Sequence, residues 1–130
     1  MSNWNLGSFA TEILLIIENV PTSAPTISGI PLMNIVERNI NFVEKYTGNN
    51  IGSTSVSLDY QGPVLDLSIA DTLELMNIQG ADVSSISLGE FSTSKGGESN
   101  LVVVAKNFRE VGMRKLQEIG RHIRFGVAFN

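Results

Sequence analysis

The sequence contains no cysteine and only one histidine, His122, among its 130 residues. The absence of cysteine excludes disulfide bonds and thiolate metal sites, and it is compatible with a reducing cytoplasm. A Ser-His-Asp site would have to use His122, near the end of the chain and without a rigid support. A zinc site of nitrogen and sulfur ligands within one chain is also excluded. We therefore expect a protein that is not an enzyme and that has no catalytic residue, metal site or cofactor.

Long hydrophobic runs and nucleotide-binding motifs are also missing. The apolar run at residues 13–17 lies between Glu12 and Glu18 and is far shorter than the ~20 residues that span a bilayer. No basic segment precedes it, so we expect neither a membrane span nor a secretory signal. The sequence has no G-x-x-x-x-G-K-[ST] phosphate loop and no G-x-S-x-G nucleophile motif. Asp71 and Glu74 are spaced to share a hard cation, although such a pair more often forms a solvated helix face.

Basic residues are scarce in the first three quarters of the chain. Residues 1–94 carry ten acidic and two basic residues, whereas residues 95–130 carry three acidic and seven basic ones, within a net charge of −4. An acidic body and a basic end favour head-to-tail association of copies. The alternative is ordinary variation of charge among helix surfaces. The length and the 42% hydrophobic content predict one globular domain.

Apolar residues recur with helical spacing in four segments, of which two lie before residue 50. The first helix is expected to begin at Ser8, as N-cap, and to end before Pro21. The second is expected to be capped by Ser28, to hold Pro31 in its first turn, and to be stopped by Gly48. The expected core-facing residues are Ile13, Ile16, Ile17 and Val20, widened by Leu14 and Leu15, in the first helix, and Leu32, Val36, Ile40 and Val43 in the second.

Two further helices are expected in the second half of the chain. The third is predicted to begin at Pro63 and to end at Gly80, and the fourth to run from a cap at Ser99 or Asn100 to Gly120. Between them, residues 83–94 alternate like a strand and predict a short β-hairpin or an extended loop. The expected core-facing residues are Leu65, Leu67, Ile69, Ala70, Leu73, Met76 and Ile78 in the third helix, and Leu101, Val104, Ala105, Phe108, Gly112, Leu116 and Ile119 in the fourth.

The last ten residues alternate between apolar and other side chains, which is typical of a half-buried strand. A terminal strand offers unpaired backbone groups and an apolar face, so it has to join a sheet in its own fold or on another protein. We interpret residues 121–130 as a docking tail that follows a helical domain at residues 1–120; the alternative is an ordinary closing strand. The predicted fold class is therefore mainly α, a bundle of about four helices with a strand-like tail. The apolar side of the tail comprises Ile123, Phe125, Val127 and Phe129, and its other side His122, Arg124, Gly126 and Ala128.

Six segments, in chain order, carry a family resemblance: FVEKYTG (42–48), LSIADTLELM (67–76), QGAD (79–82), SISLGEFS (85–92), LQEIGR (116–121) and IRF (123–125). They include a helix end with tyrosine, threonine and glycine, and a serine-isoleucine-serine stretch before a basic last helix. Together these segments resemble the head-to-tail connector, or adaptor, proteins of tailed bacteriophages. The resemblance covers most of the chain, from about Phe9 to Phe129.

The resemblance implies a structural virion protein of the neck, present in the host cytoplasm during assembly. Such proteins form a ring, usually of twelve copies, beneath the portal protein, where they extend the DNA channel and hold the stopper or tail proteins. The C-terminal segment of these proteins commonly reaches into the portal. The implied portal-docking residues are Arg121, Ile123, Arg124, Phe125, Val127 and Phe129, and the candidate contacts between subunits or loops are Ile86, Leu88, Phe91 and Lys95.

Genomic DNA is expected to pass through such a ring without sequence-specific binding. Copies of charge −4 make an acidic ring, and an acidic or neutral lumen lets DNA slide where a basic lumen would bind it. Two other functions stay open: a tail-completion or terminator protein of the neck, and a small DNA-binding regulator. Terminators are usually richer in strands. A regulator would bind duplex DNA measurably at moderate salt, although the basic residues of the last helix have no aromatic stacking platform among them.

Overall fold

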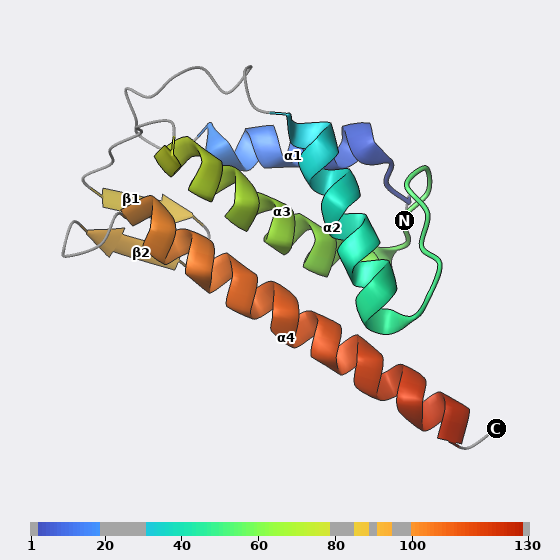
Figure 1. The fold of residues 1–130 in the computed structure, drawn as a ribbon. Coiled ribbons are helices and arrows are strands. Elements are labelled where there is room, and N and C mark those ends of the chain that lie inside the picture. The colour runs from blue at the N-terminus through green and yellow to red at the C-terminus, as the bar shows by residue number, and fades with distance from the viewer. Residues whose placement is uncertain (1–2, 19–30, 79–84, 89–90, 95–99, 129–130) are drawn as a thin grey trace.

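The computed structural model describes residues 3–18, 31–78, 85–88, 91–94 and 100–128, and the remaining residues lie outside the description (Figure 1). The described chain is mainly helical. Its elements are α1 (Leu6–Ile17), α2 (Leu32–Thr47), α3 (Leu58–Ile78), β1 (Ser85–Leu88), β2 (Phe91–Ser94) and α4 (Asn100–Ala128).

Helix α1 begins earlier than the sequence predicts, because Asn5 and not Ser8 is its N-cap. The Asn5 side chain accepts a hydrogen bond of 2.9 Å from the Ser8 backbone N–H, and the Ser8 hydroxyl accepts one of 3.3 Å from the Asn5 N–H. This reciprocal pair is a capping box, in which Ser8 holds the third helical position. The predicted N-cap therefore lies three residues too late, although Ser8 takes part in the capping as the third helical residue.

Helix α2 ends as predicted at Gly48, whose φ of +75° is left-handed and whose N–H donates to the Glu44 carbonyl at 2.8 Å. Its start differs from the prediction, because Pro31 occupies the N-cap position and not the first turn. The other proposed cap, Ser28, lies outside the described residues. The predicted inner stripe is confirmed, since Leu32, Val36, Ile40 and Val43 are all buried.

Helix α3 begins at Leu58 and contains Pro63, which the sequence predicts as its first residue. Proline removes one backbone hydrogen bond, and the cost is smallest near the start of a helix, where few such bonds exist. The carbonyl of Ser57 closes the first turn by accepting from Tyr60 at 3.1 Å and from Gln61 at 3.2 Å. The helix therefore gains one and a half turns before its proline.

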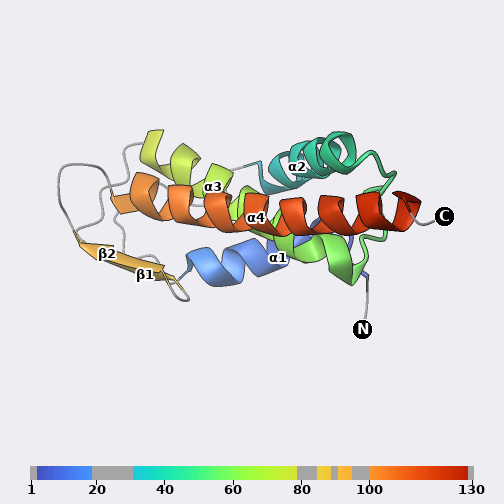
Figure 2. The same ribbon diagram turned by 90° about the horizontal axis from the view of Figure 1, so that it is seen from below.

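Helix α3 lies at the centre of the bundle and packs against each of the other three helices (Figure 2). Its buried residues lie on several sides and include the polar Asp66, Ser68 and Thr72. One hydrophobic cluster joins all four helices. The predicted stripes are largely confirmed, but Ile16, Leu65 and Ile119 are only half-buried, Ile78 is exposed, and Leu14 and Leu15 face solvent instead of widening the core. Val20 lies outside the described residues.

Helix α4 continues past Gly120 to Ala128, so the prediction of a strand-like segment is wrong for residues 121–128. The alternation of the tail was misleading because Ile119, Ile123 and Val127 also recur every four residues, which is a helical spacing. A glycine inside a helix costs about 1 kcal/mol and does not by itself end it. Figures 1 and 2 show the C-terminal turns of α4 extending beyond the other helices.

Two short pairings complete the described fold. Strands β1 and β2 pair antiparallel next to α4, with Ile86 opposite Thr93 and Leu88 opposite Phe91. In the segment before α3, Val56 forms an isolated antiparallel bridge with Trp4. The Glu44 carboxylate fixes this segment further by accepting hydrogen bonds from the backbone N–H groups of Ile51 and Gly52, at 2.8 and 2.9 Å.

Candidate interaction site

The candidate portal-docking residues of the last ten positions lie mostly on helical backbone. Arg121, Ile123, Arg124, Phe125 and Val127 belong to the last turns of α4, and Phe129 lies outside the described residues. Consecutive helical residues are turned by about 100°, so positions 123, 125 and 127 do not form the single apolar edge that a strand would present. A docking segment here would bind as a helix end and would not add a strand to another sheet.

The second candidate set, predicted to contact subunits or loops, lies at the opposite end of α4. Ile86 and Leu88 belong to β1, and Phe91 is the first residue of β2, directly opposite Leu88. Lys95 lies outside the described residues. The described members of the two candidate sets thus lie at the two ends of the long last helix (Figure 1).

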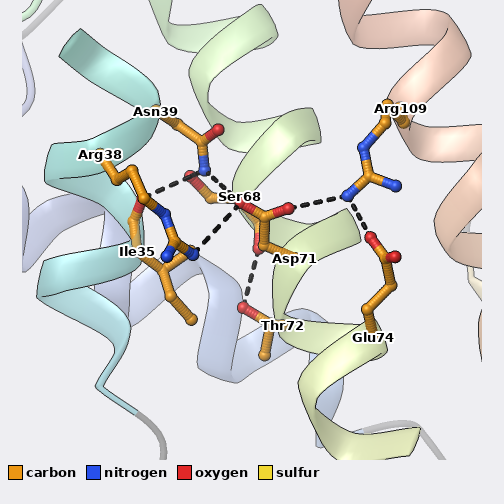
Figure 3. A network of polar contacts seen from close by, with 8 residues as sticks. All are labelled: Ile35, Arg38, Asn39, Ser68, Asp71, Thr72, Glu74 and Arg109. Carbon is orange, nitrogen blue, oxygen red and sulfur yellow. Dashed lines mark hydrogen bonds and ion pairs between the residues drawn. The ribbon is translucent and has the colours of Figure 1, made fainter. Parts of the chain in front are cut away.

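A polar network centred on Asp71 ties α2, α3 and α4 together (Figure 3). The Arg109 guanidinium of α4 donates to Asp71 Oδ1 at 2.7 Å and also to the Glu74 carboxylate. From α2, the Asn39 amide donates to Asp71 Oδ2 at 3.0 Å, and Arg38 lies 3.7 Å from the same oxygen. Each carboxylate oxygen of Asp71 therefore has a partner on a different neighbouring helix.

The buried part of this network is fully hydrogen-bonded. Besides Asp71, the Asn39 amide contacts the Ile35 carbonyl at 3.0 Å and the Ser68 hydroxyl at 3.3 Å. Thr72 donates to the Ser68 carbonyl at 2.8 Å. Among the residues whose side chains are described, no buried side-chain nitrogen or oxygen lacks a partner. A satisfied network fixes how helices sit against each other, and it leaves no buried polar group free for a ligand.

The charge of Arg109 is held by its two carboxylate partners. Burial lowers the pKa of the Arg109 guanidinium, but hydrogen bonds and attraction from Glu74 and Asp71 outweigh burial and raise that pKa above its ordinary value. A raised pKa in the folded state stabilises the fold at every pH below the ordinary arginine pKa, and the stabilisation is lost only at strongly alkaline pH. Arg109 therefore contributes no change of stability between pH 6 and pH 9.

Asp71 and Glu74, which the sequence offered as a cation-binding pair, have their carboxylates turned toward Arg109 (Figure 3). Within the described part of the chain, no three histidine or acidic side chains gather as they would around a metal ion. The same pair thus acts as an anchor for α4. The interpretation as a solvated helix face was incomplete, since Asp71 is only 25% exposed.

A further ion pair joins α3 and α4, between the Lys115 ammonium and Asp66 Oδ2 at 2.7 Å. Close to it, Gly112 lets the two helices approach, because a Cβ at this position would lie 3.2 Å from the Asp66 Cβ and 3.2 Å from the Leu67 Cγ. The acidic body and the basic end of the sequence are therefore partly neutralised within one chain. These charges are not available to a neighbouring copy, which weakens the electrostatic argument for head-to-tail association.

Exposed hydrophobic side chains were the feature that sequence analysis missed. Phe42 and Tyr46 are 42% and 43% exposed on α2, and Leu14 and Leu15 are 36% and 54% exposed on α1. The signal that indicates the α2 pair is visible in the sequence: two aromatic residues four apart, outside the inner stripe of the helix. A groove of about 420 Å³ also runs between α2 and α3, where Ile35, Leu75 and Ile78 lie beside Arg38, Asp71 and Glu74.

Among the described helices, none combines the length and the apolar character needed to cross a membrane. Comparisons of the chain with protein-family models, with curated proteins and with solved structures found no match.

Proposed function

We propose that this protein is a structural virion protein of a tailed bacteriophage, an adaptor in a ring between the portal and the tail or stopper. In this role several copies surround the DNA channel, and the C-terminal turns of α4 contact the portal. The protein has no catalytic role and needs no cofactor. Genomic DNA passes through the ring without sequence-specific contacts.

The first support is the ordered set of segments that resembles connector proteins, together with a mainly helical fold. The resembling segments are spread over α2, α3, the hairpin region and α4, so the resemblance follows the chain and does not depend on one motif. A helix-dominated fold also favours this proposal over a terminator protein. The proposal predicts a circular dichroism spectrum dominated by helix.

The observation that carries the proposal is the length of α4. Among the α4 residues whose side chains are described, Leu116 is the last fully buried one, yet the helix runs on to Ala128. Its C-terminal turns extend past the bundle in both views (Figures 1 and 2). A helix whose backbone extends past the bundle is a means of reaching a partner, and an amphipathic helix end commonly binds in a groove.

Removal of the segment tests the docking role. A chain truncated after Gly120 keeps every α4 residue that the structure shows to be buried, so we expect it to stay folded and monomer stability to change little. Binding to the portal, followed by electron microscopy of the mixed proteins, is expected to be lost. The matched control is Lys106→Ala, an exposed change near the other end of α4, which should leave portal binding intact. If the truncated chain unfolds, the segment belongs to the core and the docking role is wrong.

A DNA-binding regulator is the competing function of a different class. It would need free basic residues on the last helix, but Arg109 and Lys115 are bonded to carboxylates of α3. The adaptor proposal predicts almost no affinity of the isolated protein for duplex DNA at about 150 mM salt, where non-specific binding is already weakened. Tight, salt-dependent binding of short duplex DNA would favour the regulator.

A further inference from the structure

Helices α1 and α2 each expose large apolar side chains. The charged residues beside them are acidic on α1 and basic on α2. Contiguous exposed apolar residues, rimmed by polar ones, mark interaction surfaces in soluble proteins. The two surfaces differ in composition, and both are exposed within a single chain. They are therefore candidates for contact with a second copy.

The first surface, here called the leucine face, lies on α1. It comprises four exposed residues, Thr11, Leu14, Leu15 and Glu18. Their spacing of three, one and three residues places them on one side of the helix. Glu12 lies half-buried in the same helix. The first lysine or arginine of the chain is Arg38, so the charge of α1 is purely acidic.

The second surface, here called the aromatic face, lies on α2 and comprises Arg38, Phe42, Lys45 and Tyr46. Their spacing of four, three and one residues places them on one side of the helix. The two rings pack on each other with their centroids 6.0 Å apart. Lys45 is exposed, and the Arg38 side chain is 71% exposed despite its contact with Asp71.

The acidic residues of α2 do not cancel the positive charge of the aromatic face. The Glu44 carboxylate is committed to the backbone N–H groups of Ile51 and Gly52. Glu37 lies about 140° away from Phe42 around the helix, by the 100° turn of each residue. The aromatic face is thus apolar at its centre and basic at its edge, mainly through the exposed Lys45, because Asp71 partly neutralises Arg38. The leucine face is apolar at its centre and acidic at its edge.

We propose that the leucine face of one copy binds the aromatic face of the next copy. Two unlike, complementary patches on one chain form a heterologous contact, which closes into a ring when the rotation between copies allows it. The inference rests on the proposed function in one respect: an adaptor that forms a ring needs a contact of this kind between neighbouring copies. Stable interfaces bury about 800 Å² on each partner, so residues around both faces complete the contact.

The absence of cysteine from the sequence provides a direct test in purified full-length protein. Leu15→Cys and Phe42→Cys are mixed in equal amounts at about 50 mM salt and oxidised, because a disulfide captures even a weakly populated contact. The expected result is a disulfide-linked dimer at several-fold higher yield than with either variant alone. The matched control is Leu15→Cys mixed with Met33→Cys, since Met33 is even more exposed than Phe42, at 54% against 42%, but lies on another side of α2.

A charge exchange tests the electrostatic part of the contact. Adding Glu18→Lys to the Leu15→Cys chain places like charges opposite each other and should lower the dimer yield several-fold. Adding Lys45→Glu to the Phe42→Cys chain as well should restore the yield. Both effects should fade at about 500 mM salt, where exposed charges are screened.

Two results would overturn this contact. One is a dimer yield no greater than that of the Met33→Cys control, with all variants folded by circular dichroism. The other is efficient dimerisation of Phe42→Cys with itself, which indicates a symmetric contact between two aromatic faces. Neither result affects the proposed virion role, which is tested separately by portal binding and by the presence of the protein in particles.

Discussion

Replacement of the half-buried Arg109 by alanine should destabilise the bundle more than replacement of an exposed arginine on the same helix. Arg109 is the residue through which α4 reaches both Asp71 and Glu74 of α3 (Figure 3). Its loss leaves Glu74 without its arginine partner, while Asp71 keeps the Asn39 amide and the Arg38 guanidinium at 3.7 Å. The expected loss is therefore that of two charge-assisted hydrogen bonds.

The size of the effect follows from burial. Hydrogen bonds to charged groups contribute about 1.5–3 kcal/mol each when well buried, whereas exposed ion pairs contribute about 0.2–1 kcal/mol. Arg109 and Glu74 are 38% and 41% exposed, so solvent screens much of the attraction. We expect Arg109→Ala to lower the free energy of unfolding by about 1–2 kcal/mol, which is roughly 3–10 °C in Tm for a chain of this size.

Urea unfolding followed by the fluorescence of the single tryptophan, Trp4, measures this change, since Trp4 packs edge-on against the buried Phe9 at 5.0 Å. The matched control is Arg114→Ala, an exposed change on the same helix, expected within about 0.5 kcal/mol of the parent. A double-mutant cycle of Arg109→Ala with Glu74→Gln isolates the coupling between the two side chains. Equal stability of Arg109→Ala and Arg114→Ala would refute the anchoring role of Arg109.

Two further changes test how the helices are capped and packed. Gly112→Leu should cost about 1–3 kcal/mol of stability, because even a Cβ at this position lies 3.2 Å from Asp66 and Leu67 side-chain atoms. The control, Gln117→Leu on the exposed side of α4, should be nearly neutral. If the Gly112→Leu protein is as stable as the parent, α3 and α4 are not packed this closely. Asn5→Ala should cost about 0.5–2 kcal/mol through loss of the N-cap. Asn50→Ala, an exposed change outside the helices, serves as its control, and equal melting temperatures of the two variants would contradict the capping box.

The presence of four helices and most of their buried residues could be predicted from the sequence, because the spacing of apolar residues indicates which side of a helix is buried. The stop of α2 at Gly48 was also predictable, since a left-handed residue at a helix end favours glycine. The boundaries that failed have local causes. Serine is a good N-cap, so the sequence predicts Ser8 as the cap, yet Asn5 is equally suitable and occupies that position. The sequence also predicts Pro63 as the start of α3, although a proline is tolerated within the first turns of a helix.

The interactions between helices could not be predicted in the same way. The pairing of Asp71 with Arg109, 38 residues apart, depends on how α3 and α4 are packed, and no local pattern encodes it. Charge counts along the sequence suggested free acidic and basic surfaces, yet part of that charge is consumed in these contacts. The tail was misjudged for a related reason, since its residues satisfy both a two-residue and a four-residue repeat, and sequence alone does not choose between them.

The most direct test of the proposed function is cryo-electron microscopy of particles purified from infected cells, with mass spectrometry of the same sample. We predict that the protein is present as a ring at the exit vertex of the capsid, that its helix α4 ends against the portal, and that the surface facing the DNA is acidic or neutral. Particles that lack the polypeptide, or that hold it away from the exit vertex, would contradict the account.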